Sequence, residues 1–207
     1  MALDWKSVES FSKQLVKKIH LDGINSSYAI AGGCYKSIIT TRPPRDIDVW
    51  PYSENDRTVI VESLIKSGGV LVDDNLFNSR FIVNGNVVEV VCKKSNNFKG
   101  VFEYFDIALS CVGASFESGF FTESFVHPLV KQSVANGTPL LIIPMPNMPF
   151  LLVTLERVKR YAQELGFLYP KEQVEYLKGK YYEQPIEKRR MLLENYELVT
   201  GQKYEGF

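Results

Sequence analysis

The chain has 207 residues, 45% of them hydrophobic, so it can bury the core of one domain with a small appendage. Its 24 basic and 24 acidic residues cancel, and this balance argues against a clamp for long duplex nucleic acid. Three cysteines without metal-ligand spacing and only two histidines lead us to expect a cytoplasmic protein without a histidine-based metal site.

The N-terminal segment predicts a helix and then a strand. Residues 4–20 carry apolar side chains at helical spacing, and Asp22-Gly23 ends this pattern. A short apolar strand is expected at 27–31. The charged, amphipathic start is unlike a secretory signal, and no apolar run approaches the length of a membrane span. We therefore expect no membrane partner, and the sequence leaves the oligomeric state open.

Residues 30–50 carry the most informative pattern. Gly32 and Gly33 predict a tight turn with uncovered backbone N–H groups, opening a short helix over 34–40 suited to binding phosphate. A second strand, at 46–50, carries Asp46 and Asp48 one residue apart, so both carboxylates face the same side. That arrangement repels itself unless a divalent cation lies between the groups. The pattern indicates metal-assisted phosphoryl or nucleotidyl transfer.

Glu89 is a further carboxylate in an apolar setting. It stands in the middle of Val87-Val88-Glu89-Val90-Val91, after an Asn84-Gly85 hairpin signal. A carboxylate there is costly to bury without a partner, which a shared metal would provide. The alternative is a Glu on the solvated face of an edge strand. The surrounding elements are expected to be a helix at 54–67 and strands at 80–84, 86–93 and 105–112.

The C-terminal half changes character. Residues 113–149 are rich in Phe, Pro and Gly and predict a connector with a short helix near 128–135. From residue 150 the apolar spacing is helical, with helices expected at about 150–166, 170–179 and 185–197. The sequence thus predicts an α+β fold, a mixed sheet with helices on one face. The expected divisions are a core at 1–112, a connector at 113–149 and a small helical subdomain at 150–207.

The order Gly-Gly, short helix, Asp-x-Asp resembles the DNA polymerase β-like nucleotidyltransferase superfamily. Within it, the head of the tRNA CCA-adding and poly(A) polymerase group is most similar, and the short chain looks like a compact bacterial or phage form. Gly32, Gly33, Asp46 and Asp48 keep the spacing of that group, and Arg42 falls on its Arg position. Lys36 stands where the group has Arg, and Ser37 where it has Asp.

The resemblance implies roles for individual residues. Asp46, Asp48 and a third carboxylate would bind Mg²⁺ or Mn²⁺, and the candidates for the third are Glu89 and Asp106. Glu89 resembles the Glu of the family's Glu-Val strand, and Asp106 resembles a later Asp-Phe-Thr motif near the ribose, although Ile107 follows it here. The nucleotide contacts that the resemblance implies are Gly32, Gly33, Lys36, Arg42, Lys94, Asp106, Arg157 and Arg160.

Arg157 and Arg160 belong to a segment similar to the family's neck helix, which ends in Leu-Gly-Phe, as does this one at Leu165-Gly166-Phe167. The alternative is that these arginines only solvate the outer face of a helix.

Two functions follow as hypotheses. The first is a metal-dependent nucleotidyltransferase that moves an NMP from an NTP, such as ATP, to an acceptor hydroxyl and releases pyrophosphate. The acceptor could be an RNA 3′ end, a protein or a small molecule. The second is a catalytically inactive nucleotide-binding or regulatory module of the same fold, in a toxin or phage-defence context, which the loss of Asp at Ser37 favours. The intact Asp46-Ile47-Asp48 favours the first.

Overall fold

A computed structural model describes residues 3–93, 95–142 and 148–206. The chain divides into two compact units. The first comprises Met1–Phe105 and Leu109–Val130, and the second Asp106–Ala108 and Lys131–Phe207. None of the helices in the described residues has the length and apolar character needed to span a bilayer.

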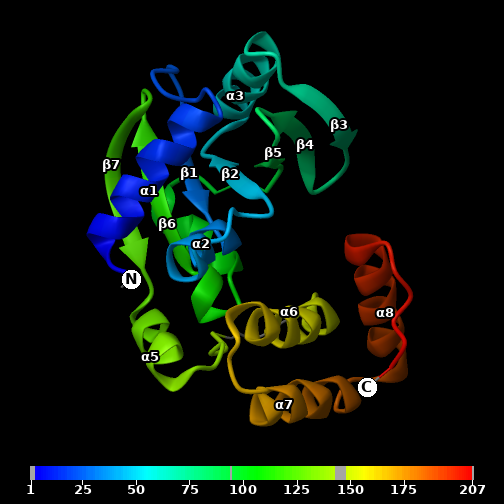
Figure 1. Ribbon diagram of the computed structural model, residues 1–207. Coiled ribbons are helices and arrows are strands. Elements are labelled where there is room, and N and C mark those ends of the chain that lie inside the picture. The colour runs from blue at the N-terminus through cyan, green and yellow to red at the C-terminus, as the bar shows by residue number, and fades with distance from the viewer. Residues whose placement is uncertain (1–2, 94, 143–147, 207) are drawn as a thin grey trace. The chain divides into compact units, whose positions relative to one another are not determined.

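The described residues of the first unit form a seven-stranded sheet in the order β3-β4-β5-β2-β1-β6-β7 (Figure 1). Neighbouring strands are antiparallel except for β2 and β5, which run parallel, so the predicted mixed sheet is confirmed. The strands are β1 Ser27–Ala31, β2 Ile47–Pro51, β3 Val70–Asp74, β4 Asn78–Val83, β5 Asn86–Val91, β6 Val112–Glu117 and β7 Phe120–Val126.

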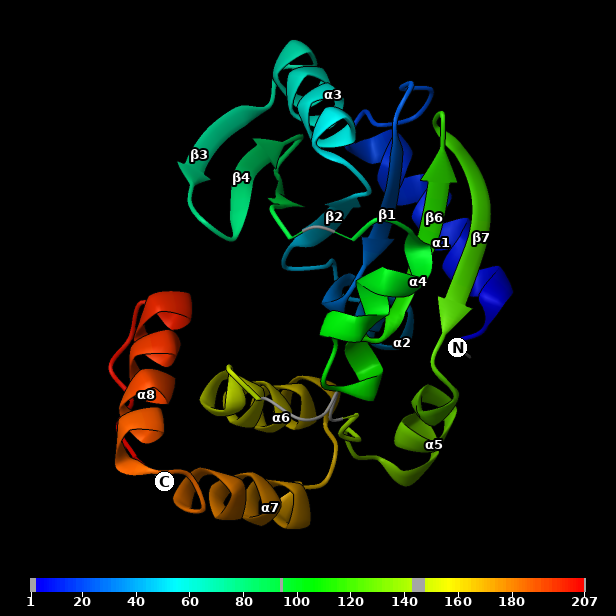
Figure 2. The same ribbon diagram turned by 180° about the vertical axis from the view of Figure 1, so that it is seen from behind.

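The main core lies on one face of this sheet. Helix α1 packs on β6 and β7, and α3 packs on β2, β3 and β5. The short α4 contacts β1, and Figures 1 and 2 show it on the face opposite to α1. The helices and turns of this unit are α1 Trp5–Lys18, η1 Gly33–Tyr35, α2 Lys36–Thr40, α3 Glu54–Lys66, α4 Phe98–Val101 and η2 Phe102–Tyr104. They are followed by η3 Ala108–Ser110 and α5 Pro128–Asn136, each of which crosses the division between the units.

Buried side chains alternate along the strands as a sheet with one core face requires. Ile47 and Val49 of β2, and Val88 and Val90 of β5, are buried in the main core. Residues between them in sequence therefore face the other side of the sheet. This alternation decides which face carries the polar residues of β2 and β5.

The expected strand at 105–112 was wrong, and the segment at 113–149 expected as a connector contains two strands, although the short helix predicted near 128–135 is present as α5. The strand begins at Val112, and β6 and β7 form a hairpin in the segment predicted as connector. Ser118 and Gly119 both have positive φ, 49° and 77°, which matches the two-residue turns that suit twisted hairpins. The aromatic strands around this turn pair Phe116 with Phe121.

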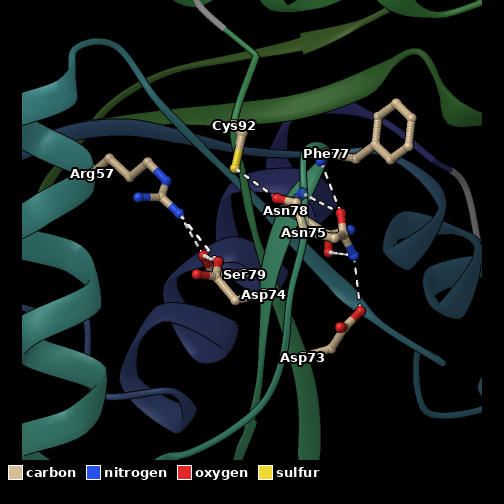
Figure 3. Close-up of polar contacts among 8 residues, drawn as sticks. All are labelled: Arg57, Asp73, Asp74, Asn75, Phe77, Asn78, Ser79 and Cys92. Atoms are coloured by element: carbon tan, nitrogen blue, oxygen red, sulfur yellow. Dashed lines mark hydrogen bonds and ion pairs between the residues drawn. The ribbon is translucent and has the colours of Figure 1, made fainter.

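Strand β3 at the edge of the sheet was not predicted. All its residues are exposed, so it lacks the apolar alternation of a half-buried strand. Side-chain contacts hold it instead, as Figure 3 shows. Arg57 of α3 donates to Ser79 Oγ and lies 3.7 Å from Asp74 Oδ1. In the β3–β4 turn, Asn75 Oδ1 accepts the backbone N–H groups of Phe77 and Asn78.

The second unit is mainly helical. Its three longer helices are α6 Leu151–Leu165, α7 Lys171–Tyr182 and α8 Ile186–Thr200, and α6 contacts both others. Leu155 and Val158 of α6, Leu177 of α7 and Leu192 of α8 are buried. Gly166 ends α6 with φ 67°, and these three helices confirm the predicted C-terminal helices.

Candidate active site

Asp48 lies on the face of the sheet opposite to the main core. Its neighbours Ile47 and Val49 are fully buried in that core, so the strand directs Asp48 to the other side, as predicted. Asp46 immediately precedes β2 and keeps 36% of its side chain exposed. The guanidinium of Arg45 lies 4.0 Å from Asp46 Oδ2, a contact too exposed to neutralise the carboxylate strongly.

Gly32 brings the backbone against Asp48. Its φ is 116°, and a Cβ atom added there would lie 2.7 Å from Asp48 Oδ2. Only glycine allows this approach without moving the carboxylate. The Gly32 N–H donates to the Val112 carbonyl at 3.0 Å, so this N–H is engaged and does not serve the predicted phosphate cradle.

The charges of Asp46 and Asp48 both act on the thiol of Cys34. Its side chain is buried, and burial raises the pKa of the thiol, with the negative charges of Asp48 and Asp46 raising it further. The thiol therefore stays protonated and packs as a small apolar group. The start of a short helical segment beside Asp46 and Asp48 is thus built from Gly32, Gly33 and a neutral Cys34.

Glu89 lies beside Asp48 on the neighbouring parallel strand. The two residues are register partners, so their side chains share one face of the sheet. The Glu89 carboxylate accepts hydrogen bonds from Arg80 Nε at 2.8 Å and from Asn78 Nδ2 at 2.8 Å. Glu89 was predicted as a third metal ligand, and this role stays a prediction. The structure places it beside Asp48 with its oxygens engaged by Asn78 and Arg80, which the sequence analysis did not identify.

Arg80 could have been found from the sequence. The predicted Asn84-Gly85 turn is a two-residue hairpin loop that pairs Val83 with Asn86. Counting back along the two strands from that pair places Arg80 opposite Glu89, which is the observed register. The signal was present, and only the step from turn type to register was missing.

The donor set suits a hard divalent cation. Mg²⁺ is commonly bound by one or two carboxylates together with substrate phosphates and water. Asp46 and Asp48 supply two such carboxylates at one end of β2. Among the described residues, no three His, Cys, Asp or Glu side chains are arranged to hold a metal ion together. The two carboxylates therefore fit a metal site in which the oxygens of a triphosphate supply further ligands.

The predicted cationic contacts of the first unit are placed as follows. Lys36 is the first residue of α2, and Arg42 is exposed in the segment between α2 and β2. The Arg42 N–H donates to Thr40 Oγ1 at 3.3 Å, and Thr41 next to it has φ 59°. Lys94 lies outside the described residues. The nucleotide roles of Lys36, Arg42 and Lys94 stay predictions.

An aromatic cluster forms around Trp50, which lies on the same strand as Asp48. Trp50 is two residues after Asp48, so it shares the same face, and its ring stacks on Tyr104 at 5.8 Å. Phe105 packs against Trp50 at 5.6 Å, and the ammonium of Lys93 lies 4.7 Å from the Tyr104 ring. This cluster closes the sheet face beyond Asp48 with apolar surface.

Asp106 belongs to the second unit. Its carboxylate accepts a hydrogen bond from the hydroxyl of Thr154 on α6, and its backbone carbonyl accepts the N–H of Ile142 at 2.7 Å. Ile107 forms a bridge with Leu141. Asp106 is thus held within the helical unit by both backbone and side chain, which gives it a fixed orientation there.

Arg157 and Arg160, which were predicted to contact the nucleotide, both lie on α6. Arg160 is close to two acidic residues one turn away on either side, Glu156 at 3.5 Å and Glu164 at 3.9 Å. Such pairs stabilise a helix slightly and offset its positive charge. Arg157 is half-buried on this helix. The pairing of Arg160 fits the alternative of a solvated helix face, and a role toward nucleotide stays a prediction for both.

No protein-family profile and no curated protein matches the sequence. Solved structures do. A CCA-adding enzyme in complex with ATP superposes with a TM-score of 0.58 at 14% identity, covering 92% of this chain and 48% of that one. The fold is that of the nucleotidyltransferases. A tRNA nucleotidyltransferase with a primer tRNA and an ATP analogue gives a TM-score of 0.55 at 14% identity, over 90% of this chain and 55% of that one.

A CCA-adding enzyme of Thermotoga maritima complexed with tRNA also matches, with a TM-score of 0.55 at 14% identity, covering 90% of this chain and 46% of that one. The chain therefore spans about half the length of the solved structures that it matches. At this identity the likeness establishes the nucleotidyltransferase fold, which agrees with the fold that the Gly-Gly and Asp-x-Asp spacing implied.

Proposed function

We propose that this chain is a divalent-metal-dependent nucleotidyltransferase. It transfers an NMP from an NTP to an acceptor hydroxyl and releases pyrophosphate. The observation that carries the proposal is the position of Asp46 and Asp48 at the start of β2, with the Gly32 backbone against Asp48, inside the nucleotidyltransferase fold. That geometry joins two oxygen-rich side chains to a close backbone approach, and no apolar packing role explains it.

The residues of the site have separate tasks in this reaction. The acceptor oxygen bonds to the α-phosphorus while the bond from that phosphorus to pyrophosphate breaks, and the hydroxyl loses its proton to water. A divalent ion bound by Asp46 and Asp48 would supply charge stabilisation to the phosphate oxygens. Asp46 and Asp48 would orient the donor, Gly32 would keep the backbone clear of Asp48, and the aromatic cluster around Trp50 would limit water on one side.

Three of the matched structures are complexes with ATP, with CTP and with tRNA. We take from them ATP and CTP as the first donors to test and an RNA 3′ end as the first acceptor. Protein and small-molecule acceptors remain further arms of the assay, because the zero net charge of the chain gives RNA no broad electrostatic attraction.

The test is transfer of label from α-labelled NTPs, with Mg²⁺ or Mn²⁺, to RNA, protein and small-molecule pools. Asp48→Asn should lower transfer by at least about 100-fold, because it removes one metal ligand. Asp22→Asn makes the same charge change at an exposed position after α1 and should leave transfer unchanged. Absence of transfer to every pool, or equal transfer by the two variants, would exclude the proposal.

A second function is favoured by particular residues. Ser37 and Ile107 depart from the family pattern, and Glu89 is already paired with Arg80. These features suit a nucleotide-binding module without catalysis. Calorimetry separates the two functions: NTP binding that needs Mg²⁺ supports the enzyme, and NTP binding of equal strength without Mg²⁺ supports the module.

A further inference from the structure

A row of charged side chains crosses four strands on the face that carries Asp48. Asp48 of β2 pairs in register with Glu89 of β5, and Glu89 pairs with Arg80 of β4. Arg80 in turn pairs with Asp73 of β3. Register partners share a face, so three carboxylates and one guanidinium lie side by side. Arg80 is the only cation of this row.

The contacts within the row are unequal. Both Nε and Nη2 of Arg80 bind Glu89 Oε1, at 2.8 Å and 2.6 Å, and Asn78 Nδ2 binds the other oxygen, Oε2, at 2.8 Å. Glu89 keeps only 14% of its side chain exposed, whereas Arg80 keeps 44%. Each oxygen of Glu89 therefore already has a donor, and both donors belong to the neighbouring strand β4.

The surroundings strengthen this pair. Hydrogen bonding to Glu89 raises the pKa of Arg80, and the negative charges of Glu89, Asp73 and Asp46 raise it further. Asp46 is thus close enough to act on the guanidinium. A divalent cation bound at Asp46 and Asp48 would share this region with a permanent positive charge, and the two cations would repel each other.

We propose that Arg80, with Asn78, keeps Glu89 out of the metal centre, so that this chain binds its cation with Asp46 and Asp48 alone. Glu89 then acts as a positioning residue that fixes Arg80, and the missing ligands come from the nucleotide. The inference rests on the proposed function, because it concerns the same metal site. Glu89 Oε1 accepts two guanidinium hydrogen bonds, which occupy both of its lone pairs, and Oε2 accepts one from Asn78, so three of the four acceptor positions of the carboxylate are taken.

A direct consequence concerns Arg80 itself. Removing the guanidinium leaves Glu89 beside Asp48 with no charged partner, in a position to become a third ligand. Arg80→Gln should therefore bind cation more tightly than the wild type. An additional carboxylate ligand raises the affinity of oxygen-ligand sites for divalent cations. The removed charge alone would also tighten binding, so the experiment must separate these two effects.

The test measures Mn²⁺ binding in the absence of nucleotide. Electron paramagnetic resonance reports the concentration of free Mn²⁺ at each point of the titration. Four proteins form a double-mutant cycle: wild type, Arg80→Gln, Glu89→Gln and the double variant. We expect Glu89→Gln to bind within about twofold of wild type, and Arg80→Gln to bind roughly three- to tenfold more tightly. In the Glu89→Gln background the same Arg80 change should tighten binding clearly less, because only the removed charge acts and Glu89 can no longer ligate.

Two controls accompany the cycle. Asp48→Asn should weaken Mn²⁺ binding by about tenfold or more, which identifies the site being measured. Arg80→Lys keeps the charge but loses the two-donor fork, so it gives an intermediate affinity and serves if Arg80→Gln does not fold. Circular dichroism of each variant establishes that the sheet is intact before binding is measured.

Two outcomes would overturn the inference. If Glu89→Gln weakens Mn²⁺ binding as much as Asp48→Asn does, Glu89 is a metal ligand in the wild type. Arg80→Gln that leaves affinity unchanged, or tightens binding equally with and without Glu89, would show that Glu89 is not held back from the metal. Because no nucleotide is present, transfer can fail while this cycle succeeds, and the cycle can fail in a protein that transfers NMP.

Discussion

Gly32 sets the space available to Asp48. A side chain at this position would meet a carboxylate oxygen at 2.7 Å, closer than real Cβ atoms come. The φ of 116° adds a second restriction, since side-chain-bearing residues rarely adopt it. Because Gly32 has no side chain, the Asp48 carboxylate can lie against its backbone. A substitution at Gly32 tests whether this contact shapes the site.

Gly32→Ala should lower the free energy of unfolding by about 1–3 kcal/mol and displace Asp48 from its position. We expect Mn²⁺ affinity to fall together with stability, because the strain is released by moving the carboxylate. Urea unfolding measures the first effect, and paramagnetic resonance of free Mn²⁺ measures the second.

Gly85→Ala is the matched control. Gly85 also has positive φ, 72°, but an added Cβ would meet nothing within 4 Å. Its backbone cost should be about 1–2 kcal/mol with unchanged Mn²⁺ affinity. If both variants keep wild-type Mn²⁺ binding, the contact between Gly32 and Asp48 does not shape the site.

Strand β3 depends on its side-chain anchors more than on burial. It lies at the sheet edge with every residue exposed, so few apolar contacts oppose its opening. Arg57 of α3 binds Ser79 of β4 and approaches Asp74 of β3, and Ser79 Oγ donates to Asp74 at 2.6 Å (Figure 3). One arginine thus joins helix α3 to both strands of the edge hairpin.

Arg57→Ala should accelerate amide hydrogen exchange in β3 by about tenfold while exchange in β1 and β2 stays unchanged. Global stability should fall by no more than about 1 kcal/mol, because the ion pair with Asp74 is partly exposed. Lys66→Ala removes a cation from the same helix whose ion pair is with Glu62, within α3 itself, and it should leave β3 exchange unaltered. Uniform acceleration across the sheet would contradict the anchor.

Elements with one buried face were predictable from the sequence. Helix α1 and strands β1 and β2 have regular apolar spacing, and the structure places them close to the expected residues. Strand β3 was missed because it is exposed on both faces, which leaves no periodicity to detect. The segment before β6 was predicted as strand, yet Ile107 forms an isolated bridge and Ala108–Ser110 a short helical turn, with their apolar side chains buried.

The features of the site also divide into those that a local sequence pattern predicts and those that depend on contacts between distant residues. The face that Asp48 takes follows from the period of a strand, so a local pattern was enough. The engagement of Glu89 by Arg80 required the register between two strands, which is set by the turn at Asn84 and Gly85. The hydrogen bond from Thr154 to Asp106 joins residues distant in sequence, and no local pattern indicates it.

The whole chain separates into units with their own cores, and the predicted site residues are divided between them. Asp46, Asp48 and Glu89 belong to the sheet unit, and Asp106 and Arg160 to the helical unit. The expected boundary after residue 112 differs from the observed division, because β6 and β7 join the sheet and extend its unit to Val130. Asp106–Ala108 belongs to the helical unit, where it is paired with the segment at 140–142.

Stability at alkaline pH is a property of the whole chain, because several buried groups are held protonated. Burial raises the pKa of the Cys111 thiol to about 12, and burial with the charges of Asp48 and Asp46 raises the pKa of Cys34. Burial likewise raises the pKa values of Tyr28 and Tyr35. In the unfolded chain the thiols return to their ordinary pKa of 9.0 and ionise first.

The sign of the effect follows from proton linkage. Above about pH 9 the unfolded chain binds fewer protons than the folded chain, so the free energy of unfolding falls as pH rises. Each thiol contributes a loss of about 1.4 kcal/mol per pH unit between its unfolded and folded pKa. Below pH 9 this stabilisation is present in full, and for Cys111 it is lost as pH approaches about 12.

Urea unfolding at pH 7.5, 9.0 and 10.5 should therefore give similar stability at the first two values and a clear loss at the third. Cys34→Ala lowers stability at every pH, because it removes packing from the core, but its loss between pH 9.0 and 10.5 should be smaller than that of the wild type. Parallel pH profiles for the two proteins would mean that Cys34 ionises as readily in the folded chain as in the unfolded one. The carboxylates of Asp46 and Asp48 beside a buried thiol make that outcome physically costly, so the pH profile also reports on the charge of the site.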